Sequence, residues 1–298
     1  MQKIKSAFRF IRSSYQLAYK HDILQKSLTH MAAGGAILLL IWLIPLILVV
    51  RLIGLSPVGL FLVGLLIMIG LISLLVWGNI ISNEISKTFD ILIQESDLFY
   101  DFEEQNRWLT DRALEGALFF LALPGEYLIA GIQRMFRSPV GQEIRWVEGS
   151  YLALPVMVNE KLSLDETMQR VKQLLGQNRA RFQPGLIPVE WIGQIIQWIL
   201  IMLGLLIGFI VGKNIANPLD ASFLMLVLAM LIGSLIAAAF MVIGIHFKSF
   251  TRTCYHTALY RWVRNVESAS LSANPEQAKP PTILRQILGR GFVKIKES

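Results

Sequence analysis

The hydrophobic residues gather into four long runs that contain no Asp, Glu, Lys, Arg or His. These runs cover residues 31–50, 57–81, 191–212 and 221–245. An α-helix rises about 1.5 Å per residue, so a run of about twenty residues reaches across the roughly 30 Å of hydrocarbon in a bilayer. A soluble core would instead spread its apolar positions among charged ones at helix or strand periods. The pattern predicts four transmembrane helices.

Two prolines refine the first pair of spans. Pro45 lies inside the first run, where a kink is expected, and Pro57 stands where the second helix is expected to begin. Since intramembrane ionisable groups usually mark proton relays, voltage sensors and ion-coupled pumps, their absence from all four runs weighs against these functions.

The basic residues predict the orientation, because positively charged loops tend to stay in the cytoplasm. Each of the two short turns between paired spans holds one basic residue, Arg51 or Lys213. Many more lie before the first span and after the last one: Lys3, Lys5, Arg9, Arg12, Lys20 and Lys26 on one side, and Lys248, Arg252, Arg261, Arg264, Lys279, Arg285, Arg290, Lys294 and Lys296 on the other. We therefore expect a multi-pass protein of the cell (inner) membrane with both termini in the cytoplasm.

The predicted fold class is an all-α integral membrane four-helix bundle, with a helical cytoplasmic segment between the second and third spans. The expected parts are a basic amphipathic cytoplasmic arm (1–30), a first transmembrane hairpin (31–82), a helical cytoplasmic or interfacial segment (83–190), a second transmembrane hairpin (191–246), and a basic tail with a flexible linker and a short amphipathic helix (247–298).

Small residues recur at four-residue spacing in the second hairpin, which allows helix backbones to approach closely in lipid. The positions are Gly204, Gly208 and Gly212 in the third span, and Gly233 with Ala237 in the fourth. They predict helix packing within the bundle or, alternatively, an interface between copies of the chain.

The net charge of +7 is unevenly divided among the cytoplasmic parts. A basic arm and a basic tail flank an acidic middle segment, which favours attraction between these parts and to anionic lipid head groups. In the arm, Ile4, Phe8, Ile11 and Tyr15 recur at helical spacing, which predicts a helix lying in the membrane interface. The chain shows no nucleic-acid-binding motif, and we expect no nucleic-acid partner.

The middle segment begins with an acidic stretch between Glu84 and Glu104. We expect these side chains to form a helix face that is solvated or pairs with the basic tail, rather than a cation site. Residues 113–136 are apolar but interrupted by charges, so interfacial helices or a re-entrant pair are expected there. Ser163 and Glu166 form a capping-box pattern that predicts the start of an amphipathic helix ending near Gly176.

Two features follow the last span. Residues 247–266 are expected to continue as a helix into the cytoplasm, with His246 and His256 in structural roles. Near the end of the chain, an apolar stripe predicts either a membrane-surface anchor or a peptide that docks on a protein partner: Ile283, Leu284, Ile287 and Leu288.

Two stretches carry a resemblance to a known family. LALPVMVNEKLSLDETMQRVKQLLGQN, residues 152–178, and CYHTALYRWV, residues 254–263, resemble a family of uncharacterised bacterial multi-pass membrane proteins. In that family an apolar helix ending at a proline leads to an amphipathic helix, and a tyrosine-containing stretch follows the last span. The family usually has more spans than the four expected here. The resemblance implies no known activity, so it assigns no functional residue.

The sequence holds no phosphate-binding glycine loop, zinc-ligand spacing or nucleophile elbow, and we expect no enzyme activity, cofactor or metal. The function that we expect is a non-enzymatic membrane scaffold or accessory subunit that presents a cytoplasmic helical surface to a protein partner. The alternative is an oligomeric channel or transporter for a small solute. A membrane-bound lipid enzyme that uses the acidic stretch is a third hypothesis.

Overall fold

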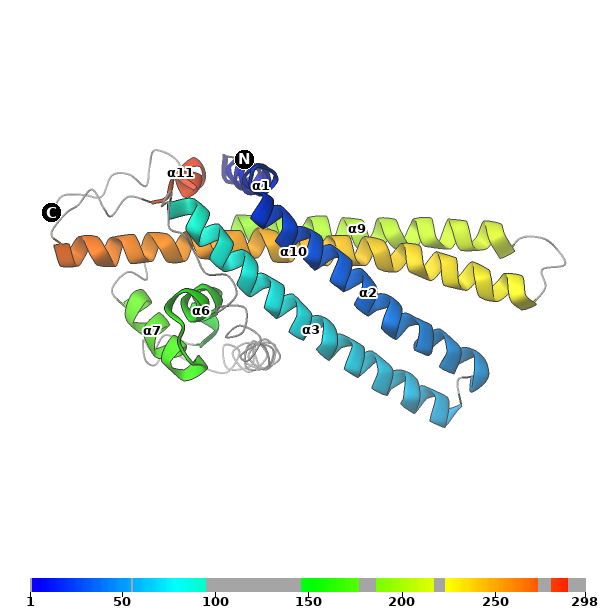
Figure 1. Cartoon of the computed structure of the whole chain (residues 1–298). Coiled ribbons are helices and arrows are strands. Elements are labelled where there is room, and N and C mark those ends of the chain that lie inside the picture. Colours follow the sequence, from blue (N-terminus) through cyan, green and yellow to red (C-terminus); the bar gives the residue numbers. More distant parts are fainter. Residues whose placement is uncertain are drawn as a thin grey trace, which may run out of the picture. The chain divides into compact units, whose positions relative to one another are not determined.

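The structure, a computed structural model, describes residues 2–54, 56–94, 146–176, 186–216, 223–272 and 280–288. All regular elements in these residues are α-helices (Figure 1). They are α1 (Gln2–Lys20), α2 (Asp22–Leu52), α3 (Pro57–Gln94), α6 (Trp146–Glu160), α7 (Leu164–Gly176), α9 (Leu186–Ala216), α10 (Phe223–Ser272) and α11 (Thr282–Leu288).

Four of these helices are long and apolar enough to cross a membrane. The qualifying segments are Leu24–Leu52, Pro57–Ile93, Val189–Ile215 and Ile232–Ala269. This confirms the all-helical class and the four long apolar helices expected from the hydrophobic runs. Helix α3 begins at Pro57 as expected, whereas α2 continues through Pro45 without an interruption of the helix.

The helices are longer than the runs that predicted them, and they divide between two compact units. Unit 1 comprises Met1–Ser27, Asn79–Ile192 and Phe250–Ser298, and unit 2 comprises Leu28–Gly78 and Gly193–Ser249. Helices α2, α3, α9 and α10 therefore each have one part in unit 2 and one part in unit 1. The uncharged part of each helix lies mainly in unit 2.

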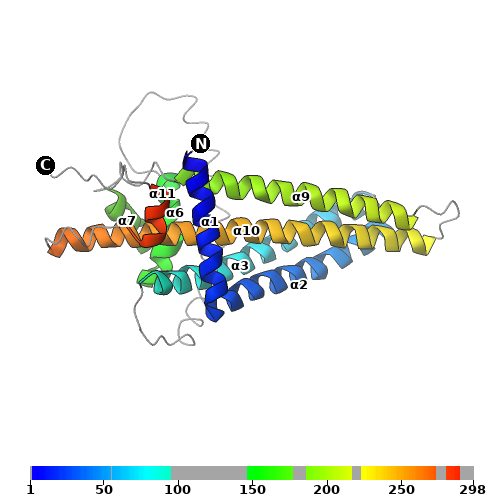
Figure 2. The same cartoon turned by 90° about the horizontal axis from the view of Figure 1, so that it is seen from above.

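In unit 2, α9 and α10 lie side by side and antiparallel (Figure 1, Figure 2). Close backbone approaches pair Gly212 with Ala229 and Gly208 with Gly233. A Cβ atom placed on Gly233 would lie only 2.6 Å from the carbonyl oxygen of Gly208. Because both sides of this contact are backbone, only glycine permits the observed separation of the two helices.

Helix α2 meets two other helices of unit 2 at a pair of adjacent glycines. Gly34 lies against the indole of Trp77 on α3, and Gly35 lies against the imidazole of His246 on α10. A Cβ atom at Gly35 would come within 2.5 Å of that ring. The small residues at the start of the first span thus leave room for two large side chains.

Unit 2 exposes many large apolar side chains on all four of its helices. Phe61 on α3 and Phe209 on α9 are each 70% exposed. Exposure of this kind is unfavourable in water, where contiguous apolar patches are usually small, but it suits a surface that faces hydrocarbon.

The second part of α10 forms the centre of unit 1. Phe250, Tyr255 and Leu259 are almost completely buried there, together with polar side chains such as Thr257. On the α3 side, the hydroxyls of Ser86 and Thr257 share a hydrogen bond of 2.8 Å. This part of α10, predicted as a simple helical continuation, is therefore surrounded by helices from distant parts of the sequence.

Helix α1 packs on this central part of α10, and only part of its predicted apolar stripe stays exposed. Phe10 makes an edge-to-face contact with Tyr255 at 5.3 Å, and Tyr15 contacts Phe250 at 4.7 Å between ring centroids. Ile4 and Phe8 remain about half exposed, whereas Ile11, from the same predicted stripe, is buried. The stripe therefore divides: Ile11 and Tyr15 belong to the side that faces protein, since the buried positions recur every three or four residues.

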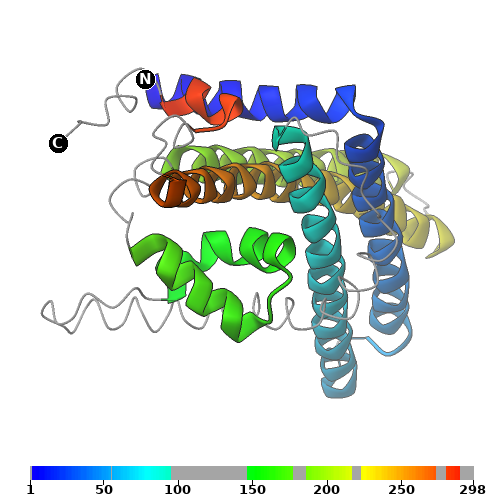
Figure 3. The ribbon, with the colours of Figure 1, turned by 60° about the vertical axis from the view of Figure 1, so that its left-hand side comes forward.

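Helices α6 and α7 form a hairpin in unit 1 (Figure 3). The capping box is confirmed: the Ser163 backbone N–H donates to Glu166 at 2.8 Å, and the Glu166 backbone N–H lies 3.4 Å from the Ser163 hydroxyl. Met168, Val171 and Leu174 are buried on one face of α7, as their spacing predicts, and α7 ends at Gly176.

Several sequence predictions fall outside the described residues. They concern residues 113–136, most of the acidic stretch, and the linker before α11. Within the described part of that acidic stretch, Glu84 accepts a 2.6 Å hydrogen bond from Ser27 on α2.

Candidate functional site

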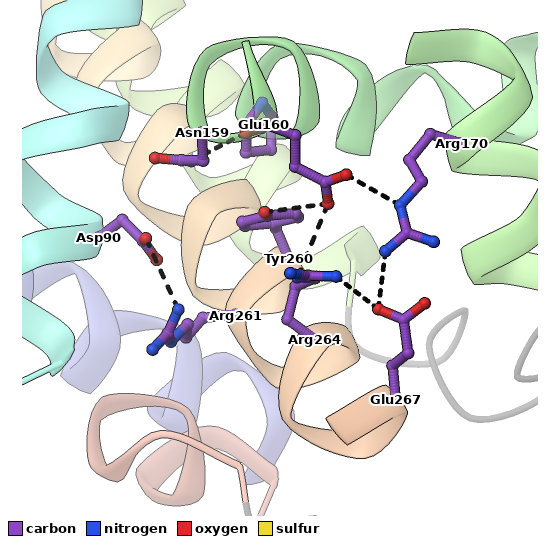
Figure 4. A network of polar contacts seen from close by, with 9 residues as sticks. Asp90, Asn159, Glu160, Arg170, Tyr260, Arg261, Arg264 and Glu267 are labelled. Carbon is purple, nitrogen blue, oxygen red and sulfur yellow. Dashed lines mark hydrogen bonds and ion pairs between the residues drawn. The ribbon is translucent and has the colours of Figure 1, made fainter. Parts of the chain in front are cut away.

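Four charged side chains from α6, α7 and α10 form a closed ring of alternating charges in unit 1, here called the ion quartet (Figure 4). Arg170 on α7 lies 2.9 Å from Glu160 on α6 and 2.7 Å from Glu267 on α10. Arg264, one turn before Glu267, completes the ring at 2.6 Å from Glu267 and 3.7 Å from Glu160. Each arginine therefore meets both glutamates.

Burial and hydrogen bonding strengthen the ion quartet. The side chains of Glu160 and Arg170 are only 16% and 20% exposed. The hydroxyl of Tyr260 donates a further hydrogen bond to Glu160 at 3.2 Å. The hydrogen bond that Arg170 donates to Glu267 raises the pKa of the guanidinium above its ordinary value, so this side chain stays protonated. Charge-assisted bonds of this kind are stronger than bonds between neutral groups.

Three further polar contacts join α10 to other helices of unit 1. Arg261 approaches Asp90 on α3 at 4.0 Å, and Asp90 is largely buried. His256 lies 3.2 Å from Glu190 on α9, and Arg252 lies 3.6 Å from the same carboxylate. Polar partners thus follow one another along α10. They connect it to α9 through Glu190, and to α3, α6 and α7 through the contacts drawn in Figure 4.

This arrangement is suited to holding the helices of unit 1 in a fixed register. In the ion quartet, the carboxylate oxygens accept from arginines and a tyrosine, and both arginines are used as donors. Among the described residues, no three His, Cys, Asp or Glu side chains are grouped so that they could hold a metal ion. The buried cysteine, Cys254, lies on α10 within the core of unit 1.

The glycines predicted at a helix interface lie between α9 and α10. Gly204 faces Phe240 and the Ala237 carbonyl, and a Cβ atom at Gly212 would lie 3.1 Å from the carbonyl oxygen of Ala229. The structure thus brings the predicted small residues together within one chain. The alternative interface between copies stays a prediction.

The apolar stripe near the end of the chain lies on α11, which packs on α1 (Figure 3). Leu284 is fully buried and Ile283 is partly buried, so at least the first half of the stripe has a partner within unit 1. The side chains of Ile287 and Leu288 lie outside the described part of the chain. Docking of this stripe on another protein or on the membrane stays a prediction.

Sequence reasoning did not find the ion quartet. Glu160, Arg170, Arg264 and Glu267 lie up to 107 positions apart in the numbering. Glu160 and Arg170 fall within residues 152–178, but nothing in that stretch indicates that they pair with each other or with residues of α10. The one local signal was the i, i+3 spacing of Arg264 and Glu267, which is compatible with an ordinary pair on a helix surface.

The fold and this site define an all-helical protein with four helices long and apolar enough to cross a membrane, and with a polar cluster that joins helices of unit 1. Comparison of the chain with models of protein families, with curated proteins and with solved structures found no match. The resemblance of residues 152–178 and 254–263 to a membrane protein family therefore stays a prediction.

Proposed function

We propose that the chain is a non-enzymatic scaffold or accessory subunit of a membrane complex. In this proposal, unit 2 crosses the cell (inner) membrane four times. Unit 1 lies on the cytoplasmic side and offers a helical surface to a protein partner. The bias of basic residues toward the arm and the tail supports this orientation.

The observation that carries the proposal is the contrast between the two units. Unit 2 turns apolar side chains such as Phe61 and Phe209 outward, as a lipid-facing bundle would. Unit 1 buries an aromatic core around Tyr255 and fastens its helices with the ion quartet, as a folded body in water would. A rigid body continuous with membrane helices is a suitable platform for a partner.

The surface of α7 is the part of unit 1 best suited to this role. Its buried face includes Met168 and Val171, and its opposite face exposes Asp165, Gln169 and Lys172. Because the ion quartet holds α7 against α10, this exposed face is presented without much loss of conformational entropy on binding.

The orientation is tested first by labelling single cysteines in a Cys254→Ser background. Cysteines placed near both termini are expected to react with a membrane-impermeant reagent only after the cells are opened. A cysteine at Asn214, in the turn-side end of α9, is expected to react in intact cells. Labelling of the termini from outside intact cells would contradict the proposed orientation.

The scaffold role is tested by purifying the full chain in mild detergent and identifying the proteins that accompany it by mass spectrometry. We expect a specific partner that is lost in the Lys172→Glu, Gln169→Glu double variant. The partner is expected to be kept in Asn214→Glu, which introduces a charge at an exposed position of α9 in unit 2. A chain that is recovered alone and monomeric in every preparation would contradict the scaffold. Solute flux into vesicles that contain only this chain would instead support the channel.

A further inference from the structure

A groove in unit 2 runs between α2, α9 and α10. Its cavity has a volume of about 750 Å³. Leu39 and Leu43 form its α2 side, and residues 201–213 of α9 and 229–241 of α10 form the other two sides. Among the described side chains that line it, only Ser234 and Lys213 are polar. The groove is therefore an apolar site with one charged end.

The small residues of the two helices explain why the groove exists. Gly208 and Gly233 bring the backbones of α9 and α10 together. Beside this contact, the side chains of Ala237 and Ala238 on α10 are small. They do not fill the space between α10 and the α2 side chains Leu39 and Leu43. An empty apolar space of this size would forfeit many dispersion contacts, so an apolar occupant is favoured.

The length of the groove matches the hydrocarbon depth of one membrane leaflet. Residues 201–213 and 229–241 each extend for about 18 Å at the helical rise of 1.5 Å per residue. Half of the hydrocarbon core of a bilayer is about 15 Å deep. One acyl chain that lies along the helices would fill such a groove from end to end.

The charged end of the groove carries two cationic side chains. Lys213 lines the groove itself. The guanidinium of Arg51, at the end of α2, lies 3.2 Å from the sulfur of Met230, which also lines the groove. Both cations stand at the ends of apolar helices. In the membrane placement proposed above they would lie near the phosphate groups of the bilayer, where they would complement an anionic head group.

We propose that this groove binds a phospholipid with an anionic head group. One acyl chain lies between α2, α9 and α10, and the phosphate group lies against Lys213 and Arg51. The proposal depends on the membrane placement of unit 2 proposed above. It adds a specific lipid site in the leaflet on the side of the two short turns, opposite the leaflet that the basic arm and tail would face.

The test uses the full chain reconstituted in phosphatidylcholine vesicles that contain a small fraction of phosphatidylglycerol with a photoreactive diazirine on one acyl chain. After irradiation, the labelled residues are identified by mass spectrometry. We expect adducts to concentrate on Met230 and Met241, and to decrease with excess unlabelled phosphatidylglycerol but not with excess phosphatidylcholine. Labelling that is as strong on the exposed Phe61 and Met68 of α3, which do not line the groove, would overturn the proposal.

Two sets of variants separate the head-group contact from the acyl-chain contact. Arg51→Gln with Lys213→Gln is expected to lower the groove adducts about tenfold or more. Lys5→Gln with Arg9→Gln removes the same charge from exposed positions of α1 and is expected to leave them unchanged. Ala238→Phe fills the groove and is expected to abolish the adducts. Equal labelling of the two charge variants would overturn the head-group assignment.

Two other results would also overturn the proposal and are distinguishable from each other. An intermolecular disulfide through Ala238→Cys, in a Cys254→Ser background, would show that a second copy of the chain occupies the groove. A chain that does not stay with the vesicles after carbonate extraction would overturn the membrane placement itself. Stable insertion with even labelling would overturn only the lipid site.

Discussion

Replacing Gly233 by alanine tests the backbone contact between α9 and α10. The added Cβ atom would lie 2.6 Å from the carbonyl oxygen of Gly208, whereas ordinary contacts begin at 3.4 Å. The oxygen belongs to a helix backbone and cannot rotate away, so the two helices must separate by about 0.8 Å, the difference between these distances. Overpacking of this kind costs about 1–3 kcal/mol.

The same substitution at Gly64 provides the control, because a Cβ atom there meets nothing within 4 Å. Gly212→Ala should fall between the two, since its Cβ atom would lie 3.1 Å from the Ala229 carbonyl oxygen. The assay is thermal unfolding in detergent micelles, followed by the loss of the monodisperse peak in size-exclusion chromatography. We expect Tm to decrease by roughly 2–10 °C for Gly233→Ala and to be unchanged or higher for Gly64→Ala.

Equal Tm values for Gly233→Ala and Gly64→Ala would refute the argument that this contact holds the two helices together. A change in the number of associated copies, with Tm unchanged, would also refute it. That result would place the glycine face between copies of the chain instead.

Three further predictions concern unit 1, each measured as thermal stability or protease resistance of the purified chain. Phe10→Ala removes a fully buried ring and is expected to lower the free energy of unfolding by about 3–5 kcal/mol. Phe8→Ala, at a half-exposed position of the same helix, should change stability little, and similar losses for the two variants would contradict the packing of α1. Arg170→Met breaks the ion quartet and is expected to lower the free energy of unfolding by about 1–3 kcal/mol. Gln169→Met is the exposed control, and equal stability of the two variants would show that the ion quartet does not stabilise the fold. Leu284→Ala should cost about 2–5 kcal/mol and expose α11 to protease, and an unchanged cleavage pattern would contradict its docking on α1.

The features that the sequence predicted are those that depend on neighbouring residues. The lengths of the uncharged runs predicted four long apolar helices, because each helix satisfies its own backbone hydrogen bonds. The Ser163–Glu166 capping box and the apolar face of α7 also follow from spacings of three and four residues. These interactions need no knowledge of the rest of the chain.

The features that only the tertiary structure decided join residues far apart in the sequence. In the sequence, nothing distinguishes Tyr255 from the other aromatic residues after the last span. In the structure it is buried at the centre of unit 1. Glu160 and Glu267 read as ordinary surface charges, and their partner Arg170 lies on a third helix. Periodicity shows which face of a helix is apolar, but it does not show which helix covers that face. For the same reason, the sequence did not show that part of the apolar stripe of α1 faces protein. Its pattern of polar and apolar residues fitted both a membrane surface and a protein core.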